Sequence, residues 1–310
     1  MTLTDVLELA TPAPSTPEPR RQRRRPKIGL WLGVGWLAAL VFCAIFANQL
    51  TFIRAYDTKI KVNGRTGRYN LGPGWRTWMG TDASSHDVFA RCIYGAKVTL
   101  TIGVLATVIG LVLGGLLGVM SGYFRGWVDR IGSIIVDSLL ALPPLLLALL
   151  LVYRMDDLKG IYTWHGWLNR EWEITLTLGI LAIAPFARIA RAQTIALRDR
   201  EFVLAARSLG AKSGRVILRE ILPNLIPAML TVAVTGLGIL VAAEGALAFL
   251  GLGVERPLTW GKMIADGQND LSRAWWATIF PCFFLFFTVI SFNLIGDRLA
   301  RRFDIREAAI

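Results

Sequence analysis

The residues of this chain that could do chemistry are few and far apart. Its two histidines, His86 and His165, have no neighbouring ligands at metal-binding spacing, so surface positions explain them better than a metal site. Its three cysteines are widely spaced and odd in number, which predicts packing residues rather than disulfides. The sequence contains no G-x-x-x-x-G-K-[ST], H-E-x-x-H or G-x-S-x-G motif. We therefore expect neither a nucleotide-binding loop nor a hydrolytic centre, and no directly bound metal or cofactor.

Two carboxylates lie in strongly apolar surroundings. Asp137 is early in one apolar run, and Glu244 is at the end of another. A charged side chain at the centre of a membrane-spanning helix costs about 2.5 to 3.5 kcal/mol on insertion scales, so such residues usually face the bundle interior or water. We expect Asp137 and Glu244 either to line or gate a translocation path, or to be interfacial residues paired with Arg130 or with backbone. Their different expected depths argue against a catalytic carboxylate pair.

A charged, amphipathic segment, "EFVLAARSLGAKSGRVILREILPN", separates two apolar runs between Glu201 and Asn224. Its helical spacing predicts a short helix with Arg207 pointing away from one apolar stripe. The stripe consists of Phe202, Ala205, Ala206 and Leu209. Gly210 should stop this helix, and a second one should begin with Ser213 as N-cap and end near Pro223. Such an element could lie on the membrane surface or insert into a groove of a soluble partner, and its small alanines favour the groove.

Six apolar runs of about 20 residues, the length that crosses about 30 Å of hydrocarbon, make up most of the remaining sequence. Hydrophobic residues account for 54% of the 310 residues, and the mean hydropathy is +0.50. Each run is apolar around its whole circumference, which favours helices. We therefore predict an all-α polytopic membrane protein with six transmembrane helices. The expected spans are Gly29 to Leu50, Ala96 to Met120, Ile131 to Tyr153, Ile174 to Ala190, Leu225 to Ala243 and Ala277 to Ile295.

Two local patterns refine these spans. The pair Pro143–Pro144 should kink the third span, and Pro185 should kink the fourth. The stretch "GLVLGGLLG", from Gly110 to Gly118, has the small-x-x-x-small spacing that allows two helices to pack closely.

The basic residues indicate the orientation of the chain, whose formal net charge is +12. With the amino terminus inside, more than half of the 34 Lys and Arg residues fall on the cytoplasmic side, so both termini should be cytoplasmic. We expect the basic tail to attract anionic lipid and no nucleic acid. The resulting organisation is a disordered tail over 1–28, a first transmembrane helix over 29–50, an extracytoplasmic segment over 51–95, a five-helix core over 96–300 that includes a cytoplasmic coupling loop over 191–224, and a cytoplasmic tail over 301–310. Within it, 51–79 should form a small hairpin that touches a binding protein, or a solvated loop.

Four motifs, in the same order, resemble the permease subunits of bacterial ABC importers in the dipeptide/oligopeptide/nickel branch. "AARSLG" followed by "ILPN" is similar to their EAA loop, the coupling helix that fits a cleft in the ATPase subunit. Three other stretches, "GTDASSHDVFARCIYGAKVTL", "EGALAFLGLGVERPLTWGKMI" and "FNLIGDRLARRFDIR", match further motifs of the branch. The resemblance covers roughly Gly80 to Arg306. It departs from the usual pattern at Leu204, Lys97 and Ile305, and Ser85–His86 replaces a usual Gly-Arg.

The resemblance implies a non-catalytic transport subunit with the transmembrane fold of type I ABC importers, located in the bacterial inner membrane. It implies a second permease subunit, two ATP-binding subunits that carry ATP and Mg, and an extracytoplasmic substrate-binding protein. Peptides are the implied cargo; nickel or another small peptide-like solute is the alternative. Outside this family, a membrane scaffold, an intramembrane enzyme or a self-sufficient carrier stay possible. The implied ATPase-coupling residues are Glu201, Phe202, Ala205, Ala206, Arg207, Leu209, Gly210, Pro223 and Asn224.

Overall fold

The structure is a computed structural model that describes residues 28–61, 70–161, 169–256 and 258–307, and within these ranges it is helical without a strand. The predicted disordered tail and His165 lie outside the described residues. The helices in chain order are α2 (Ile28–Ile45), α3 (Val88–Phe124), α4 (Gly126–Ala141), α5 (Pro144–Ile161), α6 (Arg170–Arg198), α7 (Glu201–Ser208), α8 (Ser213–Val216), the π-helix η1 (Ile217–Ile221), α9 (Leu222–Leu247), the π-helix η2 (Ala248–Leu252), α10 (Trp260–Gly267), the 3-10 helix η3 (Gln268–Asp270) and α11 (Trp276–Glu307).

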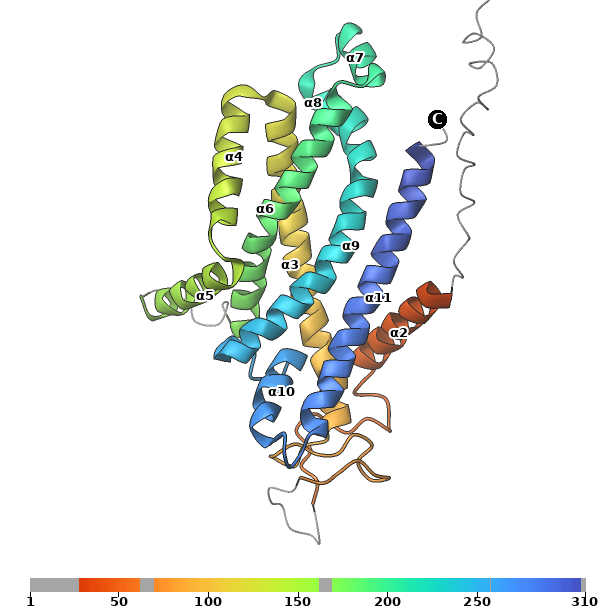
Figure 1. Ribbon diagram of the computed structural model, residues 1–310, viewed down its shortest axis with the longest axis vertical. Helices are drawn as coiled ribbons and strands as arrows, with labels where there is room; N and C mark the ends of the chain where they lie inside the picture. Colours follow the sequence, from red (N-terminus) through yellow and green to blue (C-terminus); the bar gives the residue numbers. More distant parts are fainter. Residues whose placement is uncertain (1–27, 62–69, 162–168, 257, 308–310) are drawn as a thin grey trace, which may run out of the picture.

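The four long helices α3, α6, α9 and α11 run side by side along the long axis of the molecule (Figure 1). The most extensive contact joins α3 to α6. It depends on the predicted glycine stripe, because a Cβ added at Gly118 would lie 2.7 Å from the Cβ of Ala190. Only residues without side chains allow the two backbones to approach this closely, so the stripe acts as the predicted packing surface.

Among the described residues, five helices are long and apolar enough to cross a membrane, and a bent pair, α4 with α5, raises the number to as many as six. The sequence predicted one kinked helix from Ile131 to Tyr153, and this prediction is wrong in its geometry. The two helices meet at 96°. Leu142 has the extended conformation that a residue before proline prefers, and Pro143 and Pro144 prevent the first helix from continuing. As a result, α5 projects sideways from the bundle (Figure 1).

The other spans are present with shifted ends. The first helix ends at Ile45, five residues before the predicted end. The second begins at Val88, because the Asp87 side chain accepts hydrogen bonds from Phe89 N and Ala90 N and so caps the helix. At the carboxyl end, α11 continues through the predicted tail as far as Glu307. The expected coupling loop over 191–224 is shorter than predicted, because α6 extends to Arg198.

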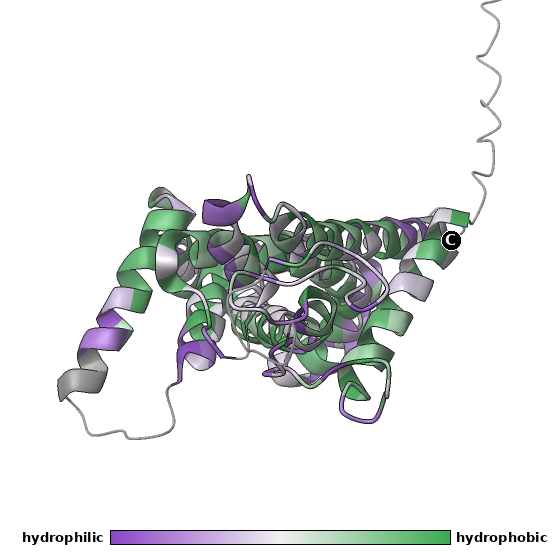
Figure 2. Ribbon diagram, turned by 90° about the horizontal axis from the view of Figure 1, so that it is seen from below, coloured by the Kyte–Doolittle hydropathy of each residue, from purple (hydrophilic) through white to green (hydrophobic). Residues whose placement is uncertain are grey.

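The two ends of the bundle carry different elements. One end carries α7, α8 and the carboxyl end of α11, and the other carries α10 and the irregular segments before α3 (Figure 1). Seen from the α10 end, the helices are mainly hydrophobic, while hydrophilic residues concentrate in the connecting segments and near the tip of α5 (Figure 2). This distribution is the one expected for helices that face lipid and one another.

Candidate functional site

The charged segment between α6 and α9 forms a helix and a sharp turn, as predicted. After α7, Gly210 adopts a positive φ of +83°, a conformation that favours glycine. Gly210 N donates to Arg207 O at 2.9 Å, and Ala211 N donates to Ala206 O at 3.0 Å. These two hydrogen bonds form a Schellman motif, which satisfies carbonyls at the end of the helix and reverses the chain.

A small apolar cluster holds α7 on the body of the molecule. Val203 is fully buried and packs with Tyr123, Val216 and Ile221. Arg207 lies over the ring of Tyr123, with 5.0 Å from its guanidinium carbon to the ring centroid. The sequence placed Arg207 away from the apolar stripe, and the structure shows what it contacts: an aromatic ring at the end of α3, at a distance typical of a cation–π interaction.

The predicted apolar stripe of α7 is left uncovered. Leu209 is 89% exposed and Phe202 is 39% exposed, and Leu204, which is not part of the predicted stripe, is 49% exposed. Ala205 is also exposed and Ala206 is half-buried, so the helix backbone is accessible on this side. A short helix whose buried contacts use one face, and whose other face shows leucine, phenylalanine and alanine, can insert into a groove of another protein.

The second helix of the segment does not end near Pro223, which corrects the sequence prediction. The helix that begins at Ser213 runs without a break past Pro223 into α9, with Lys212 rather than Ser213 at the N-cap position. The π-helix η1 widens the turn just before Pro223. The Asn224 side chain donates to Glu220 O at 2.6 Å, so a carbonyl near the proline keeps a partner. The segment is therefore continuous with the long helix α9.

The two carboxylates of the apolar runs have very different environments. Asp137 is 68% exposed on α4 and pairs with Arg188 of α6 at 3.4 Å, not with Arg130. Glu244 is fully buried near the end of α9. The hydroxyl of Thr259 lies beside it, but neither carboxylate oxygen reaches standard hydrogen-bond geometry in the part of the chain that the structure describes. The structure does not bring the two carboxylates together, and their predicted roles in gating stay predictions.

An apolar cavity of about 410 Å³ lies between α4, α6 and α9. Pro144, at the break between α4 and α5, and Pro185 of α6 both line it. Its other lining residues are leucine, isoleucine, valine, alanine, phenylalanine, glycine and a single threonine. The sequence could not identify this cavity, because its wall combines parts of four helices, α4, α5, α6 and α9, whose relative rotation is set by packing.

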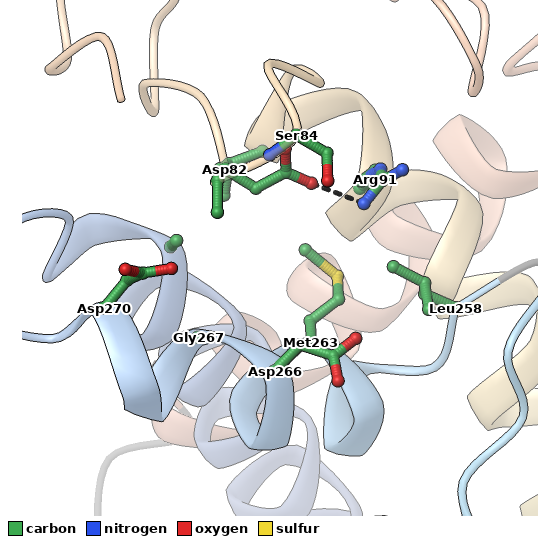
Figure 3. A pocket seen from close by; sticks show the side chains of 11 residues that line it. Asp82, Ser84, Arg91, Leu258, Met263, Asp266, Gly267 and Asp270 are labelled. Carbon is green, nitrogen blue, oxygen red and sulfur yellow. Dashed lines mark hydrogen bonds and ion pairs between the residues drawn. The ribbon is translucent and has the colours of Figure 1, made fainter. Parts of the chain in front are cut away.

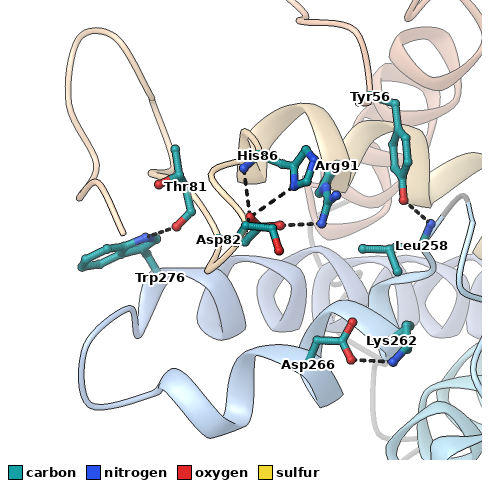
Figure 4. A network of polar contacts seen from close by, with 10 residues as sticks. Tyr56, Thr81, Asp82, His86, Arg91, Leu258, Lys262, Asp266 and Trp276 are labelled. Carbon is teal, nitrogen blue, oxygen red and sulfur yellow. Dashed lines mark hydrogen bonds and ion pairs between the residues drawn. The ribbon is translucent and has the colours of Figure 1, made fainter. Parts of the chain in front are cut away.

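At the opposite end, polar contacts join the segment before α3 to α11 and to the residues just before α10 (Figure 4). Asp82 pairs with Arg91 and lies 3.4 Å from the His86 ring nitrogen. Trp276 Nε1 donates to Thr81 O at 2.9 Å, and Leu258 N donates to the Tyr56 hydroxyl at 2.8 Å. The sequence left open whether 51–79 is a hairpin or a solvated loop. Its described part contains isolated bridges, 62–69 lie outside the described residues, and both alternatives stay predictions.

The environment changes the pKa values of two groups in this outer region. Burial lowers the pKa of His86, and the charge of Arg91 lowers it further, while Asp82 raises it. Burial also raises the pKa of Tyr56. His86 therefore favours its neutral form in the folded protein.

A small cavity of about 100 Å³ lies next to this network. Asp82, Ser84 and Arg91 line one side, and Asp266 and Asp270 from the α10 region line the other (Figure 3). Asp266 pairs with Lys262 at 2.5 Å. No group of three or more metal-binding side chains occurs within the ranges that the structure covers.

The amino-acid sequence matches a family described as the binding-protein-dependent transport system inner membrane component, over residues 114–307. The chain is 32% identical to a dipeptide transport system permease protein, DppC, of Alkalihalophilus pseudofirmus, across 96% of each chain. It is 36% identical to the DppC protein of Bacillus subtilis, across 88% of this chain and 81% of that protein. It is 33% identical to a glutathione transport system permease protein, GsiD, of Pectobacterium atrosepticum, across 76% of this chain and 75% of that protein.

Chains with a similar fold occur in solved structures of ABC transporters. One belongs to the inward-facing MetNI methionine ABC transporter, with a TM-score of 0.57 and 20% identity, across 71% of this chain and 99% of that chain. Another belongs to an amino acid ABC transporter with histidines, with a TM-score of 0.52 and 19% identity, across 69% of this chain and 94% of that chain. At these identities the likeness concerns the fold.

Proposed function

We propose a mechanism for this chain from the premise that it belongs to the family of binding-protein-dependent transport system inner membrane components. It is a multi-pass protein of the bacterial inner membrane and a permease subunit of an ABC importer for peptides. Members of this family work with ATP-binding subunits and a substrate-binding protein. The observation that carries the mechanism is the exposed apolar face of α7, with Leu209 89% exposed beside the Gly210 turn.

In this mechanism, α7 inserts its exposed face into a groove of an ATP-binding subunit. Phe202, Leu209 and the accessible backbone at Ala205 supply the contact, while Val203 and Arg207 hold the helix on the body of the permease. Glu201, Ala206, Gly210, Pro223 and Asn224 complete the coupling site. Because α7 follows α6 directly and α8 is continuous with α9, movement of the docked helix reaches both long helices.

The assembly contains a second, different permease subunit and two ATP-binding subunits. ATP and Mg bind to those ATP-binding subunits, and this chain itself is not catalytic. ATP binding closes the ATPase pair, and the displaced coupling helices switch the path between its two sides. The energy comes from the different affinities of the partners for the two conformations. The α7 end faces the cytoplasm, so the end of α11 and the amino terminus are cytoplasmic as well.

The cargo is a short peptide that the substrate-binding protein delivers to the α10 end. The relatives are named for dipeptide and glutathione transport, and this chain matches the dipeptide permeases over 81% or more of their length. Asp137 faces the path, consistent with its exposed side chain. Glu244, which is buried beside α10, gates the path from within the bundle.

The docking step is tested by co-purification from gentle detergent extracts of the native membrane. Wild-type protein should retain an ATPase that carries a G-x-x-x-x-G-K-[ST] motif. The variants Ala205→Glu and Leu209→Glu should lose it, because a charge on this face cannot enter an apolar groove. Leu271→Glu, at the opposite end and 48% exposed, is the matched control that should retain it. Equal ATPase recovery with Leu209→Glu and Leu271→Glu would contradict the docking role of α7.

A further inference from the structure

Two ion pairs join α4 to α6, and the proposed docking mechanism does not account for them. Arg191 contacts both carboxylate oxygens of Asp129, with 2.5 Å from Nε to Oδ1 and 2.8 Å from Nη2 to Oδ2. On the same two helices, Arg188 of α6 contacts Asp137 of α4 at 3.4 Å. We call these two pairs the α4–α6 ladder. The two-point contact of Arg191 is the stronger kind, since a planar guanidinium and a carboxylate fix each other's orientation.

Apart from these two ion pairs, α4 buries few of its residues against the bundle. Only Gly132 and Val136 of this helix are buried. Val136 packs against Ala184 and Ala187 of α6, while several large apolar residues of α4 are exposed. Because little apolar surface of α4 is buried, the partly buried Asp129–Arg191 pair contributes to holding α4 at its position against α6.

The two pairs differ in their surroundings. In the Asp129–Arg191 pair the carboxylate is 23% exposed and the guanidinium 39% exposed, and the Ser133 hydroxyl also lies 3.4 Å from Asp129. In the Asp137–Arg188 pair both side chains are about two-thirds exposed. Charged groups with this exposure inside an apolar run cannot face lipid at low cost, so this side of α4 and α6 faces water. A cavity of about 120 Å³ between α3, α4 and α6 is lined by Asp137, Arg188 and Arg191.

The positions of the two helices give the ladder a mechanical role. The helix α6 leads directly to α7, the proposed docking helix, through Asp199 and Arg200. The helix α4 ends at the break before Pro144, and Leu139 and Leu140 at that end form part of the wall of the large apolar cavity. The helix α6 lines this cavity as well, with Leu178 and Phe186 among its residues. The ladder therefore connects the helix that receives the movement to a second helix, α4, that forms another part of the same wall.

We propose that the Asp129–Arg191 pair is a positioning contact that transmits the displacement of the docked segment from α6 to α4, and that the water-exposed Asp137–Arg188 pair separates when α4 moves. Neither Asp129 nor Arg191 touches the ATP-binding subunit or the cargo. Removing the pair leaves docking and ATP hydrolysis in place but uncouples them from the movement of α4 and of the part of the cavity wall that α4 forms. This inference rests on the proposed ATPase-coupled function.

The test is a double-mutant cycle in the complete importer, reconstituted in vesicles with its companion subunits and binding protein. The variants are Asp129→Asn, Arg191→Gln and their combination. Each single variant should transport peptide about tenfold more slowly, within the range that charged pairs in contact show in such cycles. ATPase recovery on purification and the rate of ATP hydrolysis should stay at the wild-type level. The combined variant should be no slower than either single variant, because each change already breaks the same contact.

A control and three contrary outcomes make the test decisive. Asp157→Asn removes an exposed pair with Arg154 on α5, where such a pair contributes little, and transport should stay within about twofold of wild type. Wild-type transport in the single variants would overturn the inference, and so would additive losses in the combined variant. Loss of the ATPase from the single variants would also overturn it, since the pair would then shape the docking site. If the wild-type chain itself retains no ATPase, the proposed function fails instead.

Discussion

The turn at Gly210 allows a quantitative test of how the coupling segment is built. The backbone of Gly210 has a φ of +83°, and no atom lies within 4 Å of the position that a Cβ would take there. Alanine at this position therefore meets no steric neighbour, and its cost is the strain of the left-handed conformation, about 1–2 kcal/mol. Gly214 in α8 is the matched control, because it is equally open but has no positive φ. Alanine at Gly214 should stabilise the helix by up to about 1 kcal/mol.

This strain should appear as weaker docking of the ATPase. The unbound segment of the Gly210→Ala variant can relax by giving up the two hydrogen bonds of the turn, and docking must restore them. A strain of about 1–2 kcal/mol corresponds to a factor of about 5 to 30 in the equilibrium, so the affinity for the ATPase should fall by up to that factor. Gly214→Ala should bind with wild-type affinity or better. Gly210→Asn should lie between wild type and Gly210→Ala, since asparagine tolerates this conformation better than alanine.

The assay is titration of purified ATPase onto the permease assembly in detergent or nanodiscs, with binding followed by fluorescence. The reasoning would be refuted by equal affinities for Gly210→Ala and Gly214→Ala. It would also be refuted if Gly210→Asn bound as weakly as Gly210→Ala, because the loss would then not come from the backbone conformation.

Three further predictions concern other parts of the fold. Gly118→Ala should lower the thermal stability of the detergent-solubilised protein, because overpacking at the Ala190 contact costs about 1–3 kcal/mol. Gly115→Ala is the control and should not lower the stability, because its Cβ would lie 4.0 Å from the nearest neighbour. Because folding lowers the pKa of His86, the unfolded chain binds a proton before the folded chain does as the pH falls. The free energy of unfolding should therefore be constant above about pH 6.5 and decrease below it. Melting at several pH values should show that His86→Gln loses part of this pH dependence. Glu244→Gln should reduce peptide transport per ATP hydrolysed at normal expression, and unchanged transport would remove Glu244 from the gating mechanism.

The sequence by itself determined the class of the protein and its local elements. Long apolar runs predict membrane helices because a span of fixed thickness needs a fixed length of apolar chain. The short helix of the coupling segment and its stop at Gly210 were also predictable, since helical spacing and a glycine at the end of a helix are local patterns. The glycine stripe from Gly110 to Gly118 predicted a close helix contact, although not its partner, α6.

The effect of each proline on its helix depended on the tertiary structure. Proline was expected to end the second coupling helix near Pro223, but η1 reshapes the preceding turn and the helix continues into α9. At Pro143 and Pro144 the same residue type produces a 96° bend, which a sequence pattern cannot distinguish from a mild kink.

Contacts between distant residues also depended on the tertiary structure. Asp129 and Arg191 are 62 positions apart, and Trp260 Nε1 donates to Cys92 O across 168 positions. These contacts require the rotation and relative height of packed helices, which depend on the fit of all their side chains together. Periodicity records which face of a helix is apolar, but it contains no information about which helix that face meets. For this reason the sequence identified the segment predicted to couple, while only the packed bundle shows that α6, which leads into that segment, packs against α4 and lines the apolar cavity.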